Sequence, residues 1–571
     1  MEDNISCKFS ASEHVRTENI KDGASNSLPE PSKCEILLNL GVFFDGTKNN
    51  RRADYPGLSH SNIARLSDAY HRDETNGYYR LYVPGVGTPF PEIGEMQTST
   101  KGSAFAVGCE GRVLFGLISM LDVIHQRAFS SQKMFSETQI RLLCVAGKPS
   151  SVEDRVRLAE LYLTAGLCET DANSGNIRES FFKKQAGILQ EKLSKKGVPV
   201  IKEYVVDIFG FSRGAAEARV FASWVAQILT DGKLAGIPLR MRFLGIFDTV
   251  ASAGILSGVM GGVTNLTMPH DGWASAKYLR IPPAVENCVH FVAMHELRKN
   301  FPLDEIGVNG VLPKNHAQIA YPGSHSDVGG GYAPGELGIS SANSERAGDS
   351  LKLSQIPLNH MFDYAKLAGV PLNKKLALDN GYDPFAISPA LLRAFKNFLG
   401  QSGVGARSLH EWMQPYLDWR WQMGKRYANS LQMQRASPED RAVLKASNDQ
   451  LIRDGNLLLG AGDLKQAELH VKTALEGKRK SIYDQKYSQS SVEIPQFDDE
   501  AVKVIHDAKV AAPVSEVLTD FFDNFVHDSL AGFRRDLVES SGYWRYRKAF
   551  KGADRVFFAS TEEDAPGTAL S

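Results

Sequence analysis

A serine flanked by two glycines is the most informative local pattern in this chain. The five residues are Gly-Phe-Ser-Arg-Gly at 210–214, and they lie between the apolar segment VVDIF and the alanine-rich segment AAEARVFASWVAQIL. A serine on a sharp strand-to-helix turn needs small residues two positions away on either side, because larger side chains would collide where the backbone reverses. The pattern therefore predicts Ser212 as a nucleophile. The alternative is a glycine-rich turn at the start of a packed helix.

A serine hydroxyl attacks an ester only when a base takes its proton and an acid orients that base. Asp248 directly follows the apolar segment LRMRFLGIF, with room for one crossover helix after Ser212, so we predict it as the acid. His325 lies in the glycine-rich stretch PGSHSDVGGGY, just after another apolar segment, so we predict it as the base. The glycines would let that stretch approach the serine closely.

Other residues remain open for these two roles. Asp207 lies inside the segment before the serine and Asp327 follows the candidate base, so both are less well placed as the acid. His295, in AMHELRKNFPLD, is the main rival base, although a histidine satisfied beside the core is its more ordinary interpretation. His527, in FFDNFVHDS, is a weaker rival. Asp248 could itself be a loop cap or an ion-pair partner.

The oxygen of an attacked carbonyl becomes negatively charged, and preset hydrogen-bond donors must stabilise it. The backbone N–H of Arg213 is one donor by the geometry of the turn. We predict a second donor at Asp45 and Gly46, within the polar stretch FDGTKNN that ends an apolar segment. That stretch could instead form an Asx or glycine turn, and PGVGT at 84–88 competes for the role.

Strand-like and helix-like segments alternate along the first part of the chain. Five apolar segments of strand length end in polar or glycine-rich residues, namely 34–44, 80–83, 200–209, 239–247 and 316–321. Helical segments, among them 104–126 and 215–229, separate them. This alternation predicts an α/β fold with a mainly parallel sheet, whose strand ends would meet at one edge and bind a ligand there. The order serine, aspartate, histidine is that of the α/β-hydrolase fold.

Three parts follow from these patterns. Residues 1–33 are polar and predict a flexible N-terminal arm. Residues 34–372 carry all the strand-like segments and predict the α/β-hydrolase catalytic domain. Residues 373–571 are rich in aromatic and charged residues at helical spacing. They predict a mainly helical accessory region that packs partly back on the catalytic domain.

The composition excludes several classes of protein. Among 571 residues, 65 Lys and Arg nearly balance 66 Asp and Glu, so no strong basic field recruits nucleic acid. The chain lacks the run of about 20 apolar residues that a membrane-spanning helix needs, and its first residues do not form a secretory signal. Six cysteines without a CxxC pair give neither a dense disulfide scaffold nor zinc-ligand spacing. The stretch 101–112 lacks the ending of a phosphate-binding P-loop.

Six motifs occur in order along the chain: FFDGTKNN, YVPGVGT, DIFGFSRGAAEAR, GIFDTV, AMHELRKNFPLD and PGSHSDVGGGY. With these motifs the chain resembles, over about residues 36–372, the catalytic domain of bacterial type VI secretion phospholipase effectors of the first lipase-effector family. The later stretches VHDSLAGF and GYWRYRKAF also resemble that family. Six ordered motifs are far more specific than one serine motif.

The resemblance implies a phospholipase with A1 or A2 activity that acts on membrane phospholipid and needs no metal or organic cofactor. Matched motif to motif, its nucleophile, acid and base fall on Ser212, Asp248 and His325. It also implies a secretion spike protein and a cognate immunity protein as partners. The protein would be made in the bacterial cytoplasm without a signal peptide and would act in the periplasm of a target cell.

Two other functions remain open. A soluble carboxylesterase or thioesterase could use the same triad, and a hydrolase-fold protein could be a docking platform without catalysis. The stretch 253–266, AGILSGVMGGVTNL, is a candidate lid or interfacial loop, although a packed glycine-rich loop is at least as good an interpretation. The aromatic stretch with Trp412, Trp419 and Trp421 could lie at a membrane interface, but such stripes are more often core.

Overall fold

A seven-stranded sheet lies at the centre of the computed structural model. The structure describes residues 35–98, 108–144, 151–167, 177–195, 199–251, 274–298, 301–307, 312–313, 315–402, 409–461, 463, 465–467, 469–470, 473, 500–532 and 544–547. The predicted arm at 1–33 and the candidate lid at 253–266 both lie outside these residues.

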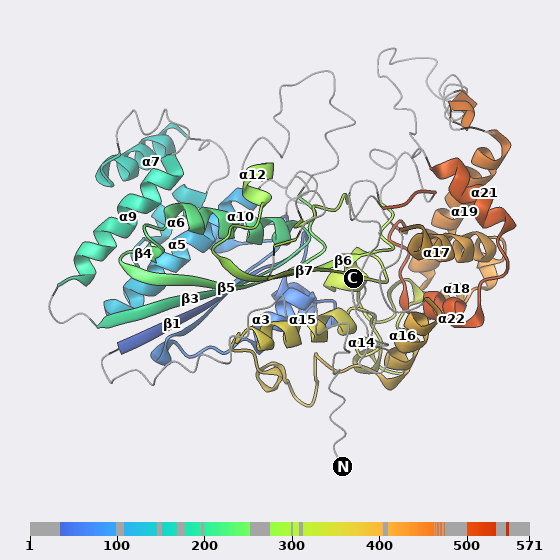
Figure 1. Ribbon diagram of the computed structural model, residues 1–571, viewed down its shortest axis with the longest axis horizontal. Helices are drawn as coiled ribbons and strands as arrows, with labels where there is room; N and C mark the ends of the chain where they lie inside the picture. Colours follow the sequence, from blue (N-terminus) through green and yellow to red (C-terminus); the bar gives the residue numbers. More distant parts are fainter. Residues whose placement is uncertain are drawn as a thin grey trace.

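Six of the strands are parallel and run in the order β2-β1-β3-β5-β6-β7 (Figure 1). Their bounds are β1 Glu35–Phe44, β2 Tyr78–Val83, β3 Val200–Phe211, β5 Ile237–Phe247, β6 Val285–Ala293 and β7 His316–Tyr321, and the short β4, Lys233–Leu234, pairs antiparallel with β5. The carboxyl ends of the parallel strands therefore meet at one edge. The predicted α/β fold with a mainly parallel sheet is confirmed.

Helices cover both faces of the sheet (Figure 1). One face carries α5 Cys109–Ala128, α6 Glu137–Cys144, α7 Val152–Thr164, α9 Ile177–Leu193, α10 Arg213–Ile228 and α12 Ala276–Leu279; the other carries α3 Asn62–Ala69 and α15 Gln355–Leu367. Along β1, Val42 and Phe44 pack in the core beneath α5 and α10, whereas Phe43 packs in the core with α3. Burial on both faces explains why the predicted strands are continuous apolar runs.

The later part of the described chain is helical, and its helices gather at the right-hand side of the molecule in Figure 1. Its helices are α16 Pro389–Ser402, α17 Leu409–Gly424, α18 Leu431–Arg435, α19 Pro438–Ala461, α21 Ala501–Val510 and α22 Glu516–Phe525. Their apolar side chains join the same core cluster as α3 and α15. Trp412, Trp419 and Trp421 are all buried in that cluster, so they form core and not a membrane interface.

Three short helices lie in loops near the sheet edge, namely α2 Arg51–Asp54, α13 His325–Gly329 and α14 Glu345–Asp349. Two strands were not among the predicted segments. One is the two-residue β4, and the other is β6, whose apolar run is interrupted by Glu286, Asn287 and His290. The helix predicted at 215–229 begins earlier, directly after Ser212.

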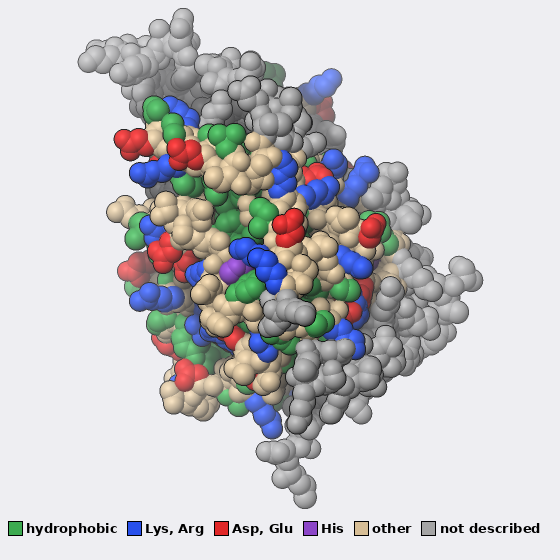
Figure 2. Space-filling model, turned by 90° about the vertical axis from the view of Figure 1, so that its left-hand side faces the viewer, with side chains coloured by type: hydrophobic (Ala, Val, Ile, Leu, Met, Phe, Trp, Pro, Cys, Tyr) green, Lys and Arg blue, Asp and Glu red, His purple; other side chains and the backbone are tan. Residues whose placement is uncertain are grey.

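Surface charge is mixed on the face shown in Figure 2, where basic, acidic and hydrophobic side chains are interspersed. This distribution agrees with the net charge of −1. Within the described ranges, no helix combines the length and the apolar character needed to cross a membrane.

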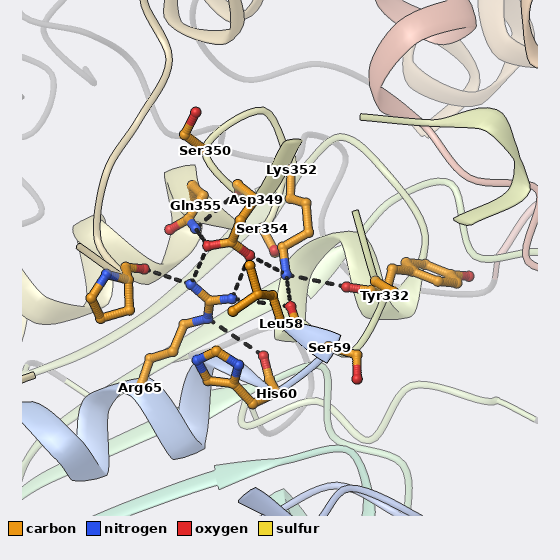
Figure 3. Close-up of polar contacts among 12 residues, drawn as sticks. Leu58, Ser59, His60, Arg65, Tyr332, Asp349, Ser350, Lys352, Ser354 and Gln355 are labelled. Carbon is orange, nitrogen blue, oxygen red and sulfur yellow. Dashed lines mark hydrogen bonds and ion pairs between the residues drawn. The ribbon is translucent and has the colours of Figure 1, made fainter. Parts of the chain in front are cut away.

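A buried ion network joins α3 to the segment after α13 (Figure 3). The guanidinium of Arg65 donates to both oxygens of Asp349, at 2.7 and 2.9 Å, and Lys352 Nζ lies 2.7 Å from the same carboxylate. Lys352 also donates to the carbonyls of Leu58 and Tyr332. Burial alone would raise the pKa of Asp349, but the two cations hold it well below its ordinary value. Burial also lowers the pKa of Lys352, to about 8.

Removing the central anion tests how much this network stabilises the fold. Asp349→Asn leaves Arg65 and Lys352 buried without a counter-charge, so we expect a loss of about 3–5 kcal/mol of unfolding free energy, measured by urea denaturation. The matched control is Asp507→Asn, which breaks an exposed ion pair with Lys503 and should change stability by less than about 1 kcal/mol. Equal effects of the two substitutions would contradict the role of the network.

Candidate active site

Ser212 occupies the turn between β3 and α10 with φ 59° and ψ −123°. Its N–H donates to the carbonyl of Phe247, at 3.0 Å, which ties the turn to the end of β5. A Cβ atom at Gly214 would lie 2.3 Å from the carbonyl oxygen of Phe44, and one at Gly210 would lie 2.5 Å from the carbonyl oxygen of Gly214. Both glycines of the motif are thus required by close backbone packing, as the sequence pattern predicts.

Asp248 follows β5 and lies beside this turn, because the ends of β3 and β5 are paired. Its Oδ2 is 2.5 Å from Nδ1 of His325, the first residue of α13. Its Oδ1 accepts hydrogen bonds from the backbone N–H of Ala293, at 2.9 Å, and from Nη1 of Arg547, at 2.5 Å. The two side chains predicted as acid and base are therefore in direct contact in a buried position.

The surroundings keep the acid ionised and the base neutral. Burial alone would raise the pKa of Asp248, but the charge of Arg547 and the hydrogen bond from His325 hold it well below its ordinary value. Burial lowers the pKa of His325, and the contact with Asp248 opposes this only in part. A neutral imidazole held by a carboxylate is the state in which a histidine can accept a proton.

Two aromatic rings fix the imidazole of His325. The ring of Phe211, the residue before Ser212, lies 4.6 Å from it between centroids, and the ring of Phe301 lies at 4.9 Å. A Cβ atom at Gly329 would lie 2.0 Å from the Phe211 ring, so the glycine-rich stretch lets α13 pack against the end of β3. The Ser212 turn, Asp248 and His325 thus share one edge of the sheet.

Residues that the sequence did not single out hold the segment of His325. Glu296 accepts a hydrogen bond from the backbone N–H of His325, at 3.2 Å, and another from the hydroxyl of Ser529, at 3.1 Å. Arg298 pairs with Glu296 at 2.8 Å. This support comes from the stretch AMHELRKNFPLD, which is one of the six ordered motifs and contains the rival base His295.

Asp207 and His295, the alternative candidates for the acid and the base, contact other parts of the protein. Asp207 accepts from Arg242, at 2.5 Å, and from the hydroxyl of Tyr70, at 3.0 Å, within the sheet. The Nδ1 atom of His295 accepts from the backbone N–H of Gly323, at 2.9 Å. The ring of His295 stacks on that of Tyr416 in the core, with 4.8 Å between centroids, and its Nε2 atom is buried without a hydrogen-bond partner.

Asp327 and His527 form a second buried aspartate–histidine pair. The Nδ1 atom of His527 is 2.5 Å from Asp327, and its ring stacks on Tyr332 with 3.7 Å between centroids. Asp327 also accepts from the N–H and hydroxyl of Ser324 at the start of α13. This pair connects the end of α22 to the helix that carries His325.

The loop after β1 is tightly bonded. Asp45 accepts hydrogen bonds from Ser61 Oγ, Tyr82 OH and the N–H of Gly46, at 2.5, 2.6 and 2.7 Å. Burial raises the pKa of Asp45 to about 6 in spite of these bonds. The N–H of Asp45 donates to the last carbonyl of β2, so the N–H groups of both predicted residues already have acceptors. The hydroxyl of Thr47, the next residue, is buried without a hydrogen-bond partner.

Arg213 is the first residue of α10, directly after Ser212. Its backbone lies at the helix N-terminus, where the N–H groups and the helix dipole favour a negative charge. Within the described ranges, no group of three or more histidine, cysteine, aspartate or glutamate side chains could hold a metal ion.

The sequence of one segment and the fold of the chain both have known counterparts. Residues 231–364 match the family model described as "T6SS, Phospholipase effector Tle1-like, catalytic domain", which confirms the predicted resemblance over this segment. A structure described as "Crystal structure of an uncharacterized protein from Pseudomonas aeruginosa" is 26% identical and has a TM-score of 0.63, covering 90% of this chain and 79% of that chain. No curated protein matches the chain.

A second solved structure is described as "Structure of the Tle1 effector bound to the VgrG spike from the Type 6 secretion system". It is 18% identical to this chain and has a TM-score of 0.33, covering 67% of this chain and 83% of that chain.

Adding one methyl group at the turn tests the close packing that holds Ser212. Gly214→Ala forces its Cβ against the backbone of Phe44 and Asp45. We expect a loss of about 1–3 kcal/mol of unfolding free energy, measured by urea denaturation. As control, Gly187→Ala adds a methyl group on the exposed face of α9 with no atom within 4 Å, and it should gain up to about 1 kcal/mol. A Gly214→Ala protein as stable as the control would contradict the packing described.

Proposed function

We propose that this chain is an antibacterial type VI secretion effector that hydrolyses the acyl esters of membrane phospholipids, with A1 or A2 activity. The observation that carries the proposal is the buried hydrogen bond of 2.5 Å between Asp248 and His325 beside the Ser212 turn. The match of residues 231–364 to a phospholipase effector catalytic domain selects the substrate class. Both Asp248 and His325 lie within that segment.

In the proposed reaction Ser212 attacks the ester carbonyl and His325 takes the hydroxyl proton. Asp248 holds the imidazole in the tautomer whose second nitrogen faces the serine, and it stabilises the imidazolium that forms. The negative oxygen of the tetrahedral intermediate accepts a hydrogen bond from the N–H of Arg213. Collapse of the intermediate gives an acyl-enzyme as His325 returns the proton to the departing oxygen, which releases the lysophospholipid. The neutral His325 then takes a proton from a water that attacks the acyl-enzyme and passes it to the oxygen of Ser212 as the fatty acid is freed.

The second donor to the oxyanion comes from the loop after β1 in this proposal. Asp45 and Gly46 shape that loop, since their N–H groups and the Asp45 carboxylate are held in internal hydrogen bonds. The partnerless buried hydroxyl of Thr47 makes that residue the best candidate to donate. The chemistry requires neither a metal nor an organic cofactor.

The cellular part of the proposal follows the family that the segment matches, which is named for type VI secretion. A secretion spike protein would carry the effector, a cognate immunity protein would block the site, and the target would be the membranes facing the periplasm of another bacterium. In this proposal residues 34–372 form the catalytic domain and residues 373–571 the accessory region.

The first test is fatty-acid release from phospholipid vesicles labelled separately at each acyl position. Wild-type protein should release one labelled fatty acid, and Ser212→Ala should lower the rate at least about a thousandfold, because the nucleophile is lost. Ser194→Ala, at an exposed position after α9, should retain wild-type activity. The label that is released identifies the bond that is cut.

Three results would point to the alternatives. Turnover of dispersed short-chain esters or thioesters in preference to vesicles would indicate a soluble esterase or thioesterase. Unimpaired toxicity of Ser212→Ala in a target periplasm would indicate a docking protein. Equal toxicity of wild-type protein in the cytoplasm and the periplasm would contradict the proposed site of action.

A further inference from the structure

An arginine from late in the chain is bonded to the acid of the candidate triad. Arg547 is buried, and its Nη1 donates to Asp248 Oδ1, at 2.5 Å, and to the carbonyl of Ala293, at 2.7 Å. Its Nη2 donates to the carbonyl of Phe301, at 3.0 Å, and the ring of Phe301 lies against His325. One guanidinium thus holds the acid, the end of β6 and the segment that flanks the base.

These bonds divide the two carboxylate oxygens between different partners. Oδ1 of Asp248 accepts from Arg547 and from the N–H of Ala293, whereas Oδ2 faces Nδ1 of His325. Rotation of the carboxylate would break two hydrogen bonds at once. The orientation of His325 is therefore fixed by donors on the far side of the acid.

The helical region holds the segment that carries Arg547. The indole N–H of Trp544 donates to the carbonyl of Leu451 in α19, at 3.1 Å. The hydroxyl of Tyr546 donates to Gln414 in α17, at 2.6 Å. Arg547 reaches Asp248 from a position set by these two helices.

Arg547 also balances the charge of the acid. Glu296 and Arg298 are the other charged groups that act on His325, and His290 interacts with Asp248. Asp327 lies two residues after His325 in α13. Glu296 and Arg298 neutralise each other at 2.8 Å, and Asp327 is bonded to His527 at 2.5 Å. Burial lowers the pKa of His290 to about 3, so it is neutral. The cation directly bonded to Asp248 is Arg547.

We propose that Arg547 is a positioning residue of the hydrolytic site, which orients the Asp248 carboxylate toward His325. Its positive charge also sets the pH above which Asp248 is ionised while His325 is neutral. The inference rests on the proposed function. Removing a positive charge beside a titrating pair raises the proton affinity of the whole pair, whichever partner takes the proton. The acid limb of the activity profile must then move to higher pH.

The experiment compares variants by the pH dependence of kcat/KM for a short-chain ester and of the labelling rate at Ser212 by a fluorophosphonate, located by mass spectrometry. Arg547→Gln keeps a donor but removes the charge, so we expect its acid limb to shift upward by about one pH unit. Arg547→Lys keeps the charge but cannot make all three hydrogen bonds. The acid limb of the Arg547→Lys profile should stay at the wild-type pH, while the plateau value of kcat/KM falls several-fold.

A matched control separates this effect from loss of stability. Arg420→Gln removes another buried arginine, paired with Asp528 at 3.2 Å in the helical region, and its acid limb should not move. Thermal unfolding is measured for every variant, and Arg547→Met replaces Arg547→Gln if the latter does not fold. Because a destabilised protein can unfold at low pH and move the limb by itself, unfolding is followed across the whole pH range, and the limbs are compared only where each variant is folded.

Two outcomes overturn the inference, and they are distinguishable. Wild-type protein that is neither labelled at Ser212 nor active would remove the proposed function and the inference with it. A labelled, active wild type whose acid limb coincides with that of Arg547→Gln would retain the proposed function and reduce Arg547 to a structural contact.

Discussion

The burial of one carboxylate governs the arrangement of the candidate site. Asp248 has no access to solvent, and a buried carboxylate is tolerated only when donors and a counter-charge replace its hydration. Its three donors come from β6, from α13 and from the segment 544–547. The sheet edge, the glycine-rich stretch and the helical region must all be in place for that charge to be satisfied.

Close backbone approach is the second constraint, and it acts around Ser212. The end of β1 lies so near the start of α10 that only glycine fits at position 214. Asp45, at that same strand end, accepts from Ser61 and Tyr82 and so ties β1 to α3 and β2. The loop predicted to supply an oxyanion donor is therefore also a structural junction.

Much of the fold followed from the sequence because parallel strands buried on both faces leave a strong apolar signal. The five predicted strand segments are found in the sheet, and Asp248 and His325 could be paired because each follows such a segment. The strand β6 was not predicted because polar residues interrupt its apolar run. These residues are tolerated there because they have partners inside the protein: His290, for example, is hydrogen-bonded to Gln318 and Thr249.

The supporting residues of the site could not be predicted for a different reason. Glu296 and Arg547 contact residues far from them in sequence, and no local periodicity reports such a contact. Asp45 and Gly46 were chosen by position after a strand, but a position does not show whether an N–H already has an acceptor. The acceptor of the Asp45 N–H becomes known only when the loop is seen beside β2, where this N–H donates to the carbonyl of Val83.

The contact between Asp248 and Arg547 can form only late in the synthesis of the chain. A ribosome makes the chain from its N-terminus, so the serine turn, the acid and the base all emerge long before residue 547. Until then the Asp248 carboxylate lacks its guanidinium partner, although Ala293 and His325 are already made. The arrangement couples completion of the candidate site to synthesis of residue 547, and a product terminated before that residue would carry Ser212, Asp248 and His325 without the guanidinium contact.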